Sequence, residues 1–302
     1  MNAASVVMLV LRVSLALTVL AVSLNARPRD TTYLVRHPAL LLRSFTAMNI
    51  VMPAVALLFT LLFSLSPAVE LALIALTVSP IPPFLPGKAL KSGGDEAYTV
   101  SLLTTMSLLS IVIIPVTMAF LGRLFGLRAT VRPSTVANIV GNGILLPVAI
   151  GIGIRWLAPV FASKIMKPVD IIAKVAIVAG LIPLLIKTWP AVHSVVDDGT
   201  LCAIIGISVI ALGVGHTFGG PVAEDRPVLA LATACRHPGV AIAIASAVFP
   251  KDPEVGAAVI ASVLVAAVVT IPYVRMSYRA MHSADHLNRR APDAPAPSHH
   301  RA

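Results

Sequence analysis

The sequence predicts an all-α polytopic membrane protein with nine transmembrane helices, and two observations carry this prediction. Of the 302 residues, 57% are hydrophobic and only 12% are charged, which is about half the charged fraction of an average soluble domain. Apolar segments long enough to cross a bilayer also recur along the whole chain, with short connections between them. The composition excludes a water-soluble globule and a disordered chain. Two cysteines are too few for a disulfide scaffold.

Each expected helix is an apolar run of about 20 residues, and only short loops separate the runs. Arg12 interrupts the first run and no Lys or Arg precedes it, so we expect a retained helix rather than a cleaved signal peptide. The expected spans are 4–24, 42–64, 67–87, 98–122, 137–160, 169–190, 199–219, 227–249 and 254–275.

The placement of the charges predicts the partner and the orientation. The net charge is +10, but most Lys and Arg residues lie at the ends of apolar segments, which indicates a lipid bilayer rather than nucleic acid. With the N-terminus outside, most of these residues fall in inner loops, so we expect an inner (plasma) membrane protein with a cytoplasmic C-terminus. The loop from Arg123 to Arg132 fits this topology poorly. Residues 283–302 are rich in Pro, Ala, His and Arg, and are expected to form a disordered basic tail.

Two expected helices, the third and the eighth, are predicted to break inside the membrane. A proline lacks the backbone N–H and clashes with the preceding turn, and lipid satisfies none of the groups that it frees. Broken segments therefore lie within protein or line a wet cavity, and paired breaks are typical of a transporter's binding site. The eighth helix has Pro238 and Gly239 near its middle. The third helix contains Pro80, Pro82, Pro83, Pro86 and Gly87.

The residues near the breaks point to an anionic substrate. Arg236 keeps its charge and either satisfies carbonyls freed by Pro238 or binds an anion. His237 is a candidate proton carrier, although a hydrogen-bonding core role is favoured; Lys88 either faces the cavity or snorkels, and Thr99 lines the cavity or packs. No acidic residue lies in the middle of an expected span, so the field there is positive, and half-helix amino ends add to it. The predicted substrate-binding residues are Arg236, His237, Thr233, Pro238, Gly239, Pro82, Pro86, Gly87, Lys88 and Thr99.

Three motifs resemble those of the bile acid:sodium symporter family, and the resemblance covers most of the chain. The motifs are ArgHisProAlaLeuLeuLeuArg at 36–43 leading to IleValMetPro at 50–53, the proline-rich break followed by GlyGlyAsp at 93–95, and ArgHisProGlyValAlaIleAlaIleAla at 236–245. The family fold implies ten helices, or nine where the first is missing, built as an inverted repeat and divided into a panel and a core. Two discontinuous helices cross in the core at the substrate and ion sites, and the two expected breaks match them.

The sequence departs from the family pattern where the family binds sodium. Leu85 and Pro86 stand in place of a Ser-Asn pair, Ala232 and Arg236 in place of a Glu and a Gln, and Met48 in place of a further Gln. Because sodium needs several oxygen ligands, the resemblance implies that the fold is kept and that these sodium sites are lost. The guanidinium of Arg236 then takes the electrostatic role of a bound cation. Transport is uncoupled, proton-linked or coupled to sodium elsewhere.

The predicted function is secondary-active transport of a small organic anion by alternating access, with residues 1–282 as the transporter domain. The sequence contains no ATP-binding, hydrolase or metal motif, so we expect no enzyme activity and no cofactor. Two alternatives stay open. A membrane-embedded enzyme acting on a lipid-linked substrate would bring His216, His237 or a carboxylate together. A non-transporting sensor of the same fold would have a sealed core.

Overall fold

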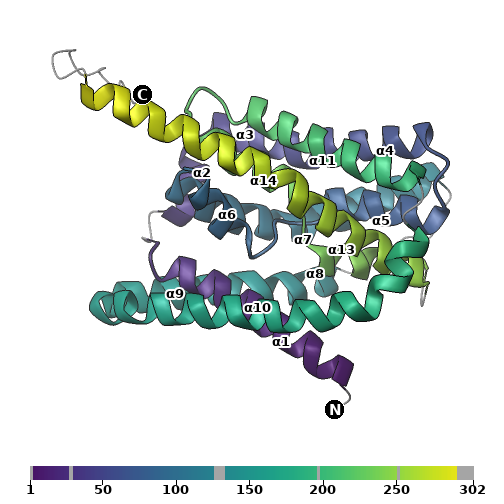
Figure 1. Cartoon of the computed structure of the whole chain (residues 1–302), viewed down its shortest axis with the longest axis horizontal. Helices are drawn as coiled ribbons and strands as arrows, with labels where there is room; N and C mark the ends of the chain where they lie inside the picture. Colours follow the sequence, from purple (N-terminus) through teal and green to yellow (C-terminus); the bar gives the residue numbers. More distant parts are fainter. Residues whose placement is uncertain (1–2, 27–29, 126–132, 196–197, 250–251, 291–302) are drawn as a thin grey trace.

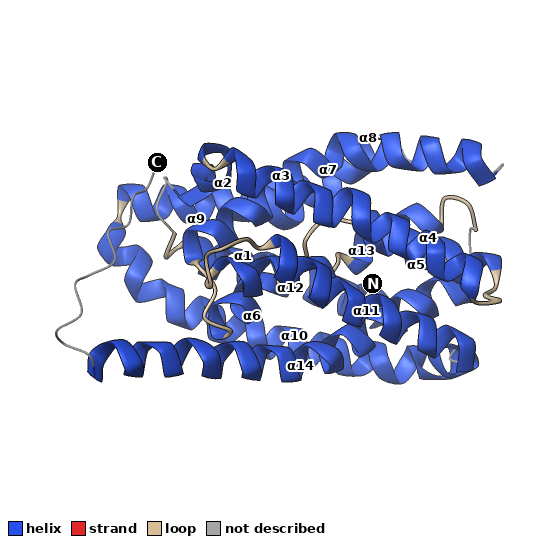
Figure 2. Cartoon of the chain, turned by 90° about the horizontal axis from the view of Figure 1, so that it is seen from above, coloured by secondary structure: helices blue, strands red, loops and turns tan. Residues whose placement is uncertain are grey.

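A computed structural model describes residues 3–26, 30–125, 133–195, 198–249 and 252–290, and all of the regular structure in these ranges is helical (Figure 2). The first half of the chain forms α1 (Ala3–Ser23), the 3-10 turn η1 (Asp30–Thr32), α2 (Tyr33–Arg36), α3 (Pro38–Thr46), the π-helical turn η2 (Ala47–Val51), α4 (Met52–Leu62), α5 (Pro67–Val78), α6 (Leu85–Lys91) and α7 (Glu96–Phe125). The second half forms α8 (Pro133–Val140), the π-helical turn η3 (Gly141–Leu145), α9 (Leu146–Leu157), α10 (Pro159–Val195), α11 (Asp198–Phe218), α12 (Asp225–Ala234), α13 (Pro238–Ala245) and α14 (Pro253–Arg290).

Six stretches of the described residues are long and apolar enough to cross a membrane. They indicate a multi-pass membrane protein, as predicted. Two shorter apolar helices, Leu9–Ser23 and Pro67–Val78, accompany them. The count of nine transmembrane helices stays a prediction. The six stretches are Pro38–Leu62, Glu96–Phe120, Val136–Leu157, Gly199–Phe218, Asp225–Ala245 and Pro253–Met281.

The helices form two groups. In one group α1 packs against α9 and α10, and the three lie together along the lower edge of Figure 1. In the other group α11 packs on α12, and α5 packs on α13 and α14, with α3, α4 and α11 along the upper edge. Contacts of α10 with α14 join the two groups. The most enclosed span is Asp225–Ala245, with 72% of its residues buried against 28–44% in the other five.

Loops that the charge pattern assigns to one side of the membrane lie at one end of the molecule. The Asp95 N–H donates to the Glu224 carbonyl over 3.2 Å, which joins the loop before α7 to the loop before α12. At the opposite end the Ser66 hydroxyl donates to a carboxylate oxygen of Glu254 over 2.5 Å. We call the end that contains Asp95 and Glu224 the inner end, following the predicted orientation. Residues 126–132 of the loop that fits this topology poorly lie outside the described residues.

The last helix continues into the residues predicted to form the C-terminal tail. α14 continues to Arg290, and the predicted tail begins at 283. The apolar periodicity does end there, but no Pro or Gly follows until Pro292, so nothing in the sequence stops the helix. The rest of the predicted tail, 291–302, lies outside the described residues.

Candidate functional site

Both predicted breaks are present, and they meet. α5 ends at Val78 and α6 begins at Leu85, while α12 ends at Ala234 and α13 begins at Pro238. The backbone N–H of His237, in the second break, donates to the carbonyl of Pro80, in the first, over 2.9 Å. Two interruptions from distant parts of the chain are therefore joined by a direct hydrogen bond.

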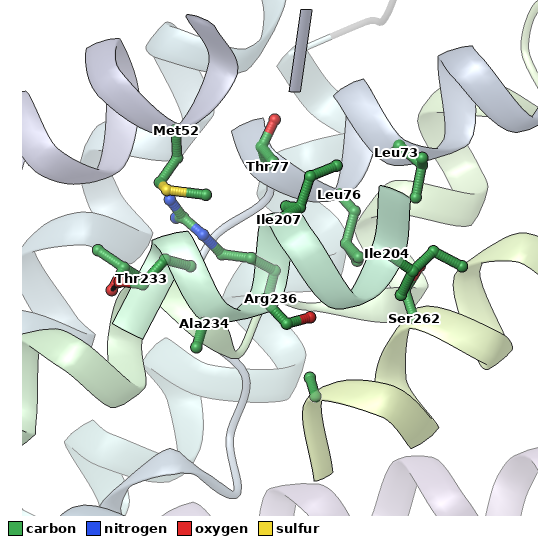
Figure 3. Close-up of a pocket in the computed structure, with 13 residues that line it drawn as sticks. Met52, Leu73, Leu76, Thr77, Ile204, Ile207, Thr233, Ala234, Arg236 and Ser262 are labelled. Carbon is green, nitrogen blue, oxygen red and sulfur yellow. Dashed lines mark hydrogen bonds between the residues drawn. The ribbon is translucent and has the colours of Figure 1, made fainter. Parts of the chain in front are cut away.

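Arg236 links the two breaks with its side chain. It is only 5% exposed. Its Nη1 donates to the Ser79 carbonyl over 3.1 Å, and its Nη2 donates to the Met48 carbonyl over 2.6 Å. Figure 3 shows the side chain extending from the end of α12 toward Met52. Across the described residues the ion pair found joins Lys174 and Asp170 on α10, so Arg236 binds backbone oxygens and no carboxylate.

Prolines explain why these two carbonyls need a donor. In a continuing helix the Ser79 oxygen would accept from residue 82 or 83, and both are prolines without an N–H. In η2 the Met52 N–H donates to Ala47, five residues back, so the next donor in this pattern, for Met48, would be Pro53. The carbonyls that Arg236 satisfies therefore differ from those expected from the sequence, because they are freed by Pro82, Pro83 and Pro53 rather than by Pro238.

The neighbours of Arg236 hold the break in place. His237 is 7% exposed, and its Nδ1 accepts from the Val240 N–H at the start of α13 over 3.4 Å. This is the hydrogen-bonding core role that the sequence favoured. The Thr233 hydroxyl lies 2.6 Å from the Ala211 carbonyl, which fixes α12 to α11. Pro238 occupies the first turn of α13, where its missing N–H costs nothing.

A small cavity lies beside the point where the two breaks meet, which we call the crossing. Its volume is about 30 Å³, which admits about two waters at most and no organic anion. The Nε of Arg236 is buried and has no hydrogen-bond partner among the described residues. Arg236, which lines this cavity, therefore keeps one cationic N–H without a partner in the described part of the chain. The cavity is lined by Met52, Leu73, Leu76, Thr77, Ile204, Ile207, Ser208, Ala211, Thr233, Ala234, Arg236, Ser262 and Ala266.

Of the ten predicted site residues, the lining of this cavity includes Thr233 and Arg236. Pro82, Pro86 and Gly87 belong to the first break and α6, and Gly239 follows Pro238 in α13. Lys88 donates to the Thr270 hydroxyl over 3.1 Å and lies above the Phe84 ring. Thr99 donates to the Asp95 carbonyl over 2.5 Å in the first turn of α7. The last two side chains are thus occupied with local contacts.

Several polar residues that line the cavity were not predicted from the sequence. Thr77, Ser208 and Ser262 come from α5, α11 and α14 and converge on it. The signal was available, because hydroxyl side chains inside apolar spans commonly face other helices rather than lipid. Which of the many hydroxyls face the crossing depends on how the helices are rotated, and the sequence does not show this.

His216 and His237, the two histidines named for the enzyme alternative, have different partners in the described structure. His216 Nδ1 pairs with the Tyr273 hydroxyl at 2.8 Å, whereas His237 caps α13. Within the described ranges, no three His, Cys, Asp or Glu side chains are placed to hold a metal ion.

Comparison with known proteins identifies the family. The model of the sodium bile acid symporter family matches residues 12–192, a stretch that contains α5, the first break and α6. A search of curated proteins finds no match to the chain. The family match covers more than half of the 302 residues. The chain therefore belongs to the sodium bile acid symporter family.

Proposed function

We propose that the protein is a secondary-active transporter of a small organic anion and works by alternating access. The observation that supports this most is the buried guanidinium of Arg236, which lies at the crossing of the two breaks beside a cavity and has an unsatisfied Nε. A buried charge without an opposite partner is unfavourable by several kcal/mol. An anionic group from a substrate, such as a carboxylate, would compensate this charge and accept the free N–H.

We further propose that the Arg236 guanidinium replaces a sodium ion of the family. The positions that the resemblance assigns to two sodium-binding glutamines are Met48 and Arg236, and these two residues are in contact through the 2.6 Å hydrogen bond from Nη2. Ala232, at the position of the family's glutamate, is fully buried and offers only a methyl group. The crossing then keeps a positive charge in every state of the transport cycle.

The two helix groups suggest how access alternates. In the proposed architecture nine helices span the membrane as an inverted repeat, with α1, α9 and α10 in the panel and the two broken helices in the core. The cavity of about 30 Å³ corresponds to a closed conformation. Movement of the core against the panel opens it to one side of the membrane at a time. The N-terminus lies outside and the C-terminus lies in the cytoplasm.

Anion binding tests the assignment of Arg236. Taurocholate and a panel of short monocarboxylates and dicarboxylates are titrated onto the purified protein, and binding is followed by calorimetry. For any anion that binds, Arg236→Gln weakens the affinity about tenfold or more, because a charge-assisted hydrogen bond contributes about 1.5–3 kcal/mol. Lys174→Gln, which removes an exposed cation of α10, leaves the affinity unchanged. Equal affinities of the wild type and Arg236→Gln would remove Arg236 from the site.

A non-transporting sensor of the same fold is the second candidate, because the cavity admits no organic anion in this conformation. Flux separates the two functions. A transporter moves a labelled form of the anion identified by calorimetry into proteoliposomes. A sensor binds the anion and leaves the lumen empty.

A further inference from the structure

Asp225 is a buried carboxyl group outside the substrate site. It is the first residue of α12 and lies at the inner end of the molecule. Asp225 is only 4% exposed, and its Oδ1 is buried without a hydrogen-bond partner among the described residues. The adjacent Arg226 does not pair with it, because its guanidinium donates to the carbonyls of Gly220 and Pro221. Such a group in its charged form is strongly unfavourable.

The surroundings of Asp225 add like charge. Asp95 and Glu224 are close enough to repel its negative charge, and His37 attracts it. The buried phenol of Tyr98 also lies within electrostatic range. Desolvation and the two carboxylates favour the neutral carboxyl. His37 and the amino end of α12 favour the ionised form, so the balance between the two forms depends on burial.

A contact between the turn at 92–95 and α12 lies next to Asp225 in the chain. Residues 92–95 form a turn that follows α6 and packs against α12. A Cβ on Gly94 would lie 2.6 Å from the Val228 side chain, so only a glycine fits there. The hydrogen bond from the Asp95 N–H to the Glu224 carbonyl closes the same contact. Separation of this turn from α12 would expose the Asp225 carboxyl to water, which stabilises its ionised form.

We propose that Asp225 is a proton-binding residue that controls opening of the inner end. Its carboxyl holds a proton while the turn at 92–95 covers α12, and it releases the proton to water when the turn moves away. The proton is thus the ligand of a second site, separated from the crossing by the length of α12. This inference rests on the proposed function, because an inner opening serves a transporter.

Infrared difference spectroscopy of the full-length protein detects this proton directly, with the proton itself as the probe. Spectra are recorded in detergent between about pH 5 and about pH 8, the range where carboxyls with altered surroundings titrate. The wild type shows a protonated-carboxyl band that disappears as the pH rises, and Asp225→Asn lacks this band. Asp170→Asn, in the exposed ion pair with Lys174, retains it. If Asp225→Asn does not fold, Asp225→Glu shifts the band instead of removing it. A band unchanged in Asp225→Asn or Asp225→Glu overturns the proposal.

Opening is measured at Cys235, a buried thiol beside Arg236, in a Cys202→Ala background that removes the exposed thiol. The rate of reaction with N-ethylmaleimide is divided by the rate for the denatured chain at the same pH, which corrects for thiol ionisation. This ratio rises about tenfold or more between about pH 5 and about pH 8, since loss of the proton shifts the population toward the open form. In Asp225→Asn, which mimics the neutral carboxyl, the ratio stays low throughout. A ratio that rises equally in Asp225→Asn overturns control of opening.

The two proposals fail separately. If anion binding is the same in the wild type and Arg236→Gln while the Asp225 band is present, only the proposed function is refuted. Absence of the band in a protein that binds anions through Arg236 would refute only the proton site.

Discussion

Arg236 and Pro53 form a pair at the scale of single residues, because the proline removes the donor that Met48 would otherwise have and the arginine supplies it. Arg236→Met leaves the carbonyls of Met48 and Ser79 without donors, at a cost of about 1–3 kcal/mol each. In a Pro53→Ala background the alanine N–H is available to Met48. We therefore expect Arg236→Met to destabilise the Pro53→Ala protein less than the wild type, by about 1–3 kcal/mol.

Unfolding by SDS in mixed micelles measures this double-mutant cycle. Pro147 provides the control, because η3 has the same register, with the Leu146 N–H donating to Gly141 five residues back, but Arg236 does not reach it. Pro147→Ala and Arg236→Met should be additive. Additivity of Pro53→Ala with Arg236→Met would show that the Met48 hydrogen bond contributes nothing.

The importance of Arg236 can be predicted from the sequence, but its partners cannot. A cation beside a helix break in an apolar span needs acceptors, and this is visible in the printed chain. That one acceptor is the Met48 carbonyl follows from the π-helical register of η2. That register depends on one extra residue in a turn, a feature of backbone geometry that residue types do not reveal.

At the scale of helices, the tight packing of α11 on α12 sets the position of the second break. A Cβ on Gly215 would lie 2.4 Å from the Ala230 Cα and 2.5 Å from the Leu229 carbonyl. Gly215→Ala therefore forces the backbones of α11 and α12 apart, and we expect it to destabilise the protein by about 1–3 kcal/mol. The same SDS titration measures it.

Gly213 on the same helix is the matched control, since a Cβ there meets nothing within 4 Å. Gly213→Ala should be neutral or stabilising by up to about 1 kcal/mol through its higher helix propensity. Similar losses of stability in Gly213→Ala and Gly215→Ala would mean that backbone flexibility, and not the α11–α12 contact, is responsible.

Helix breaks are more predictable than helix ends. The first break follows from clustered prolines and the second from Pro238 and Gly239, whose effects on the backbone are local, and both were located from the chain alone. α14 continues to Arg290, past the loss of apolar character at 283, because a drop in hydrophobicity does not by itself end a helix. The π-helical turns η2 and η3 were not predicted, because residue types do not reveal the extra residue in each turn.

At the scale of the whole molecule, the predicted topology gives a labelling test. Ala223 lies in the loop before α12 at the inner end, and Ser64 lies in the loop after α4 at the other end; both are exposed. In intact cells, a membrane-impermeant maleimide should label Ser64→Cys and spare Ala223→Cys, with Cys202→Ala as the background. Lysis should make Ala223→Cys reactive. Labelling of Ala223→Cys in intact cells would reverse the orientation.

The class of the molecule could be predicted from its composition, because 12% charged residues are too few to cover the surface of a water-soluble protein. The meeting of the two breaks was an expectation from paired interruptions, and the hydrogen bond from His237 to Pro80 confirms it. The size of the cavity was beyond prediction. It depends on how side chains such as Met52 and Ile207 fill the space, and on which conformation of a moving protein is seen.

In the proposed site, the Arg236 guanidinium stands where the resemblance places a sodium ion. Uptake of the identified anion into proteoliposomes, compared in sodium and in choline buffer, tests it most directly. We predict that the wild-type rates differ by less than about twofold, far below the tenfold that 1.4 kcal/mol of coupling would produce, and that Arg236→Gln loses uptake in both buffers. Uptake that requires sodium and persists in Arg236→Gln would contradict the claim.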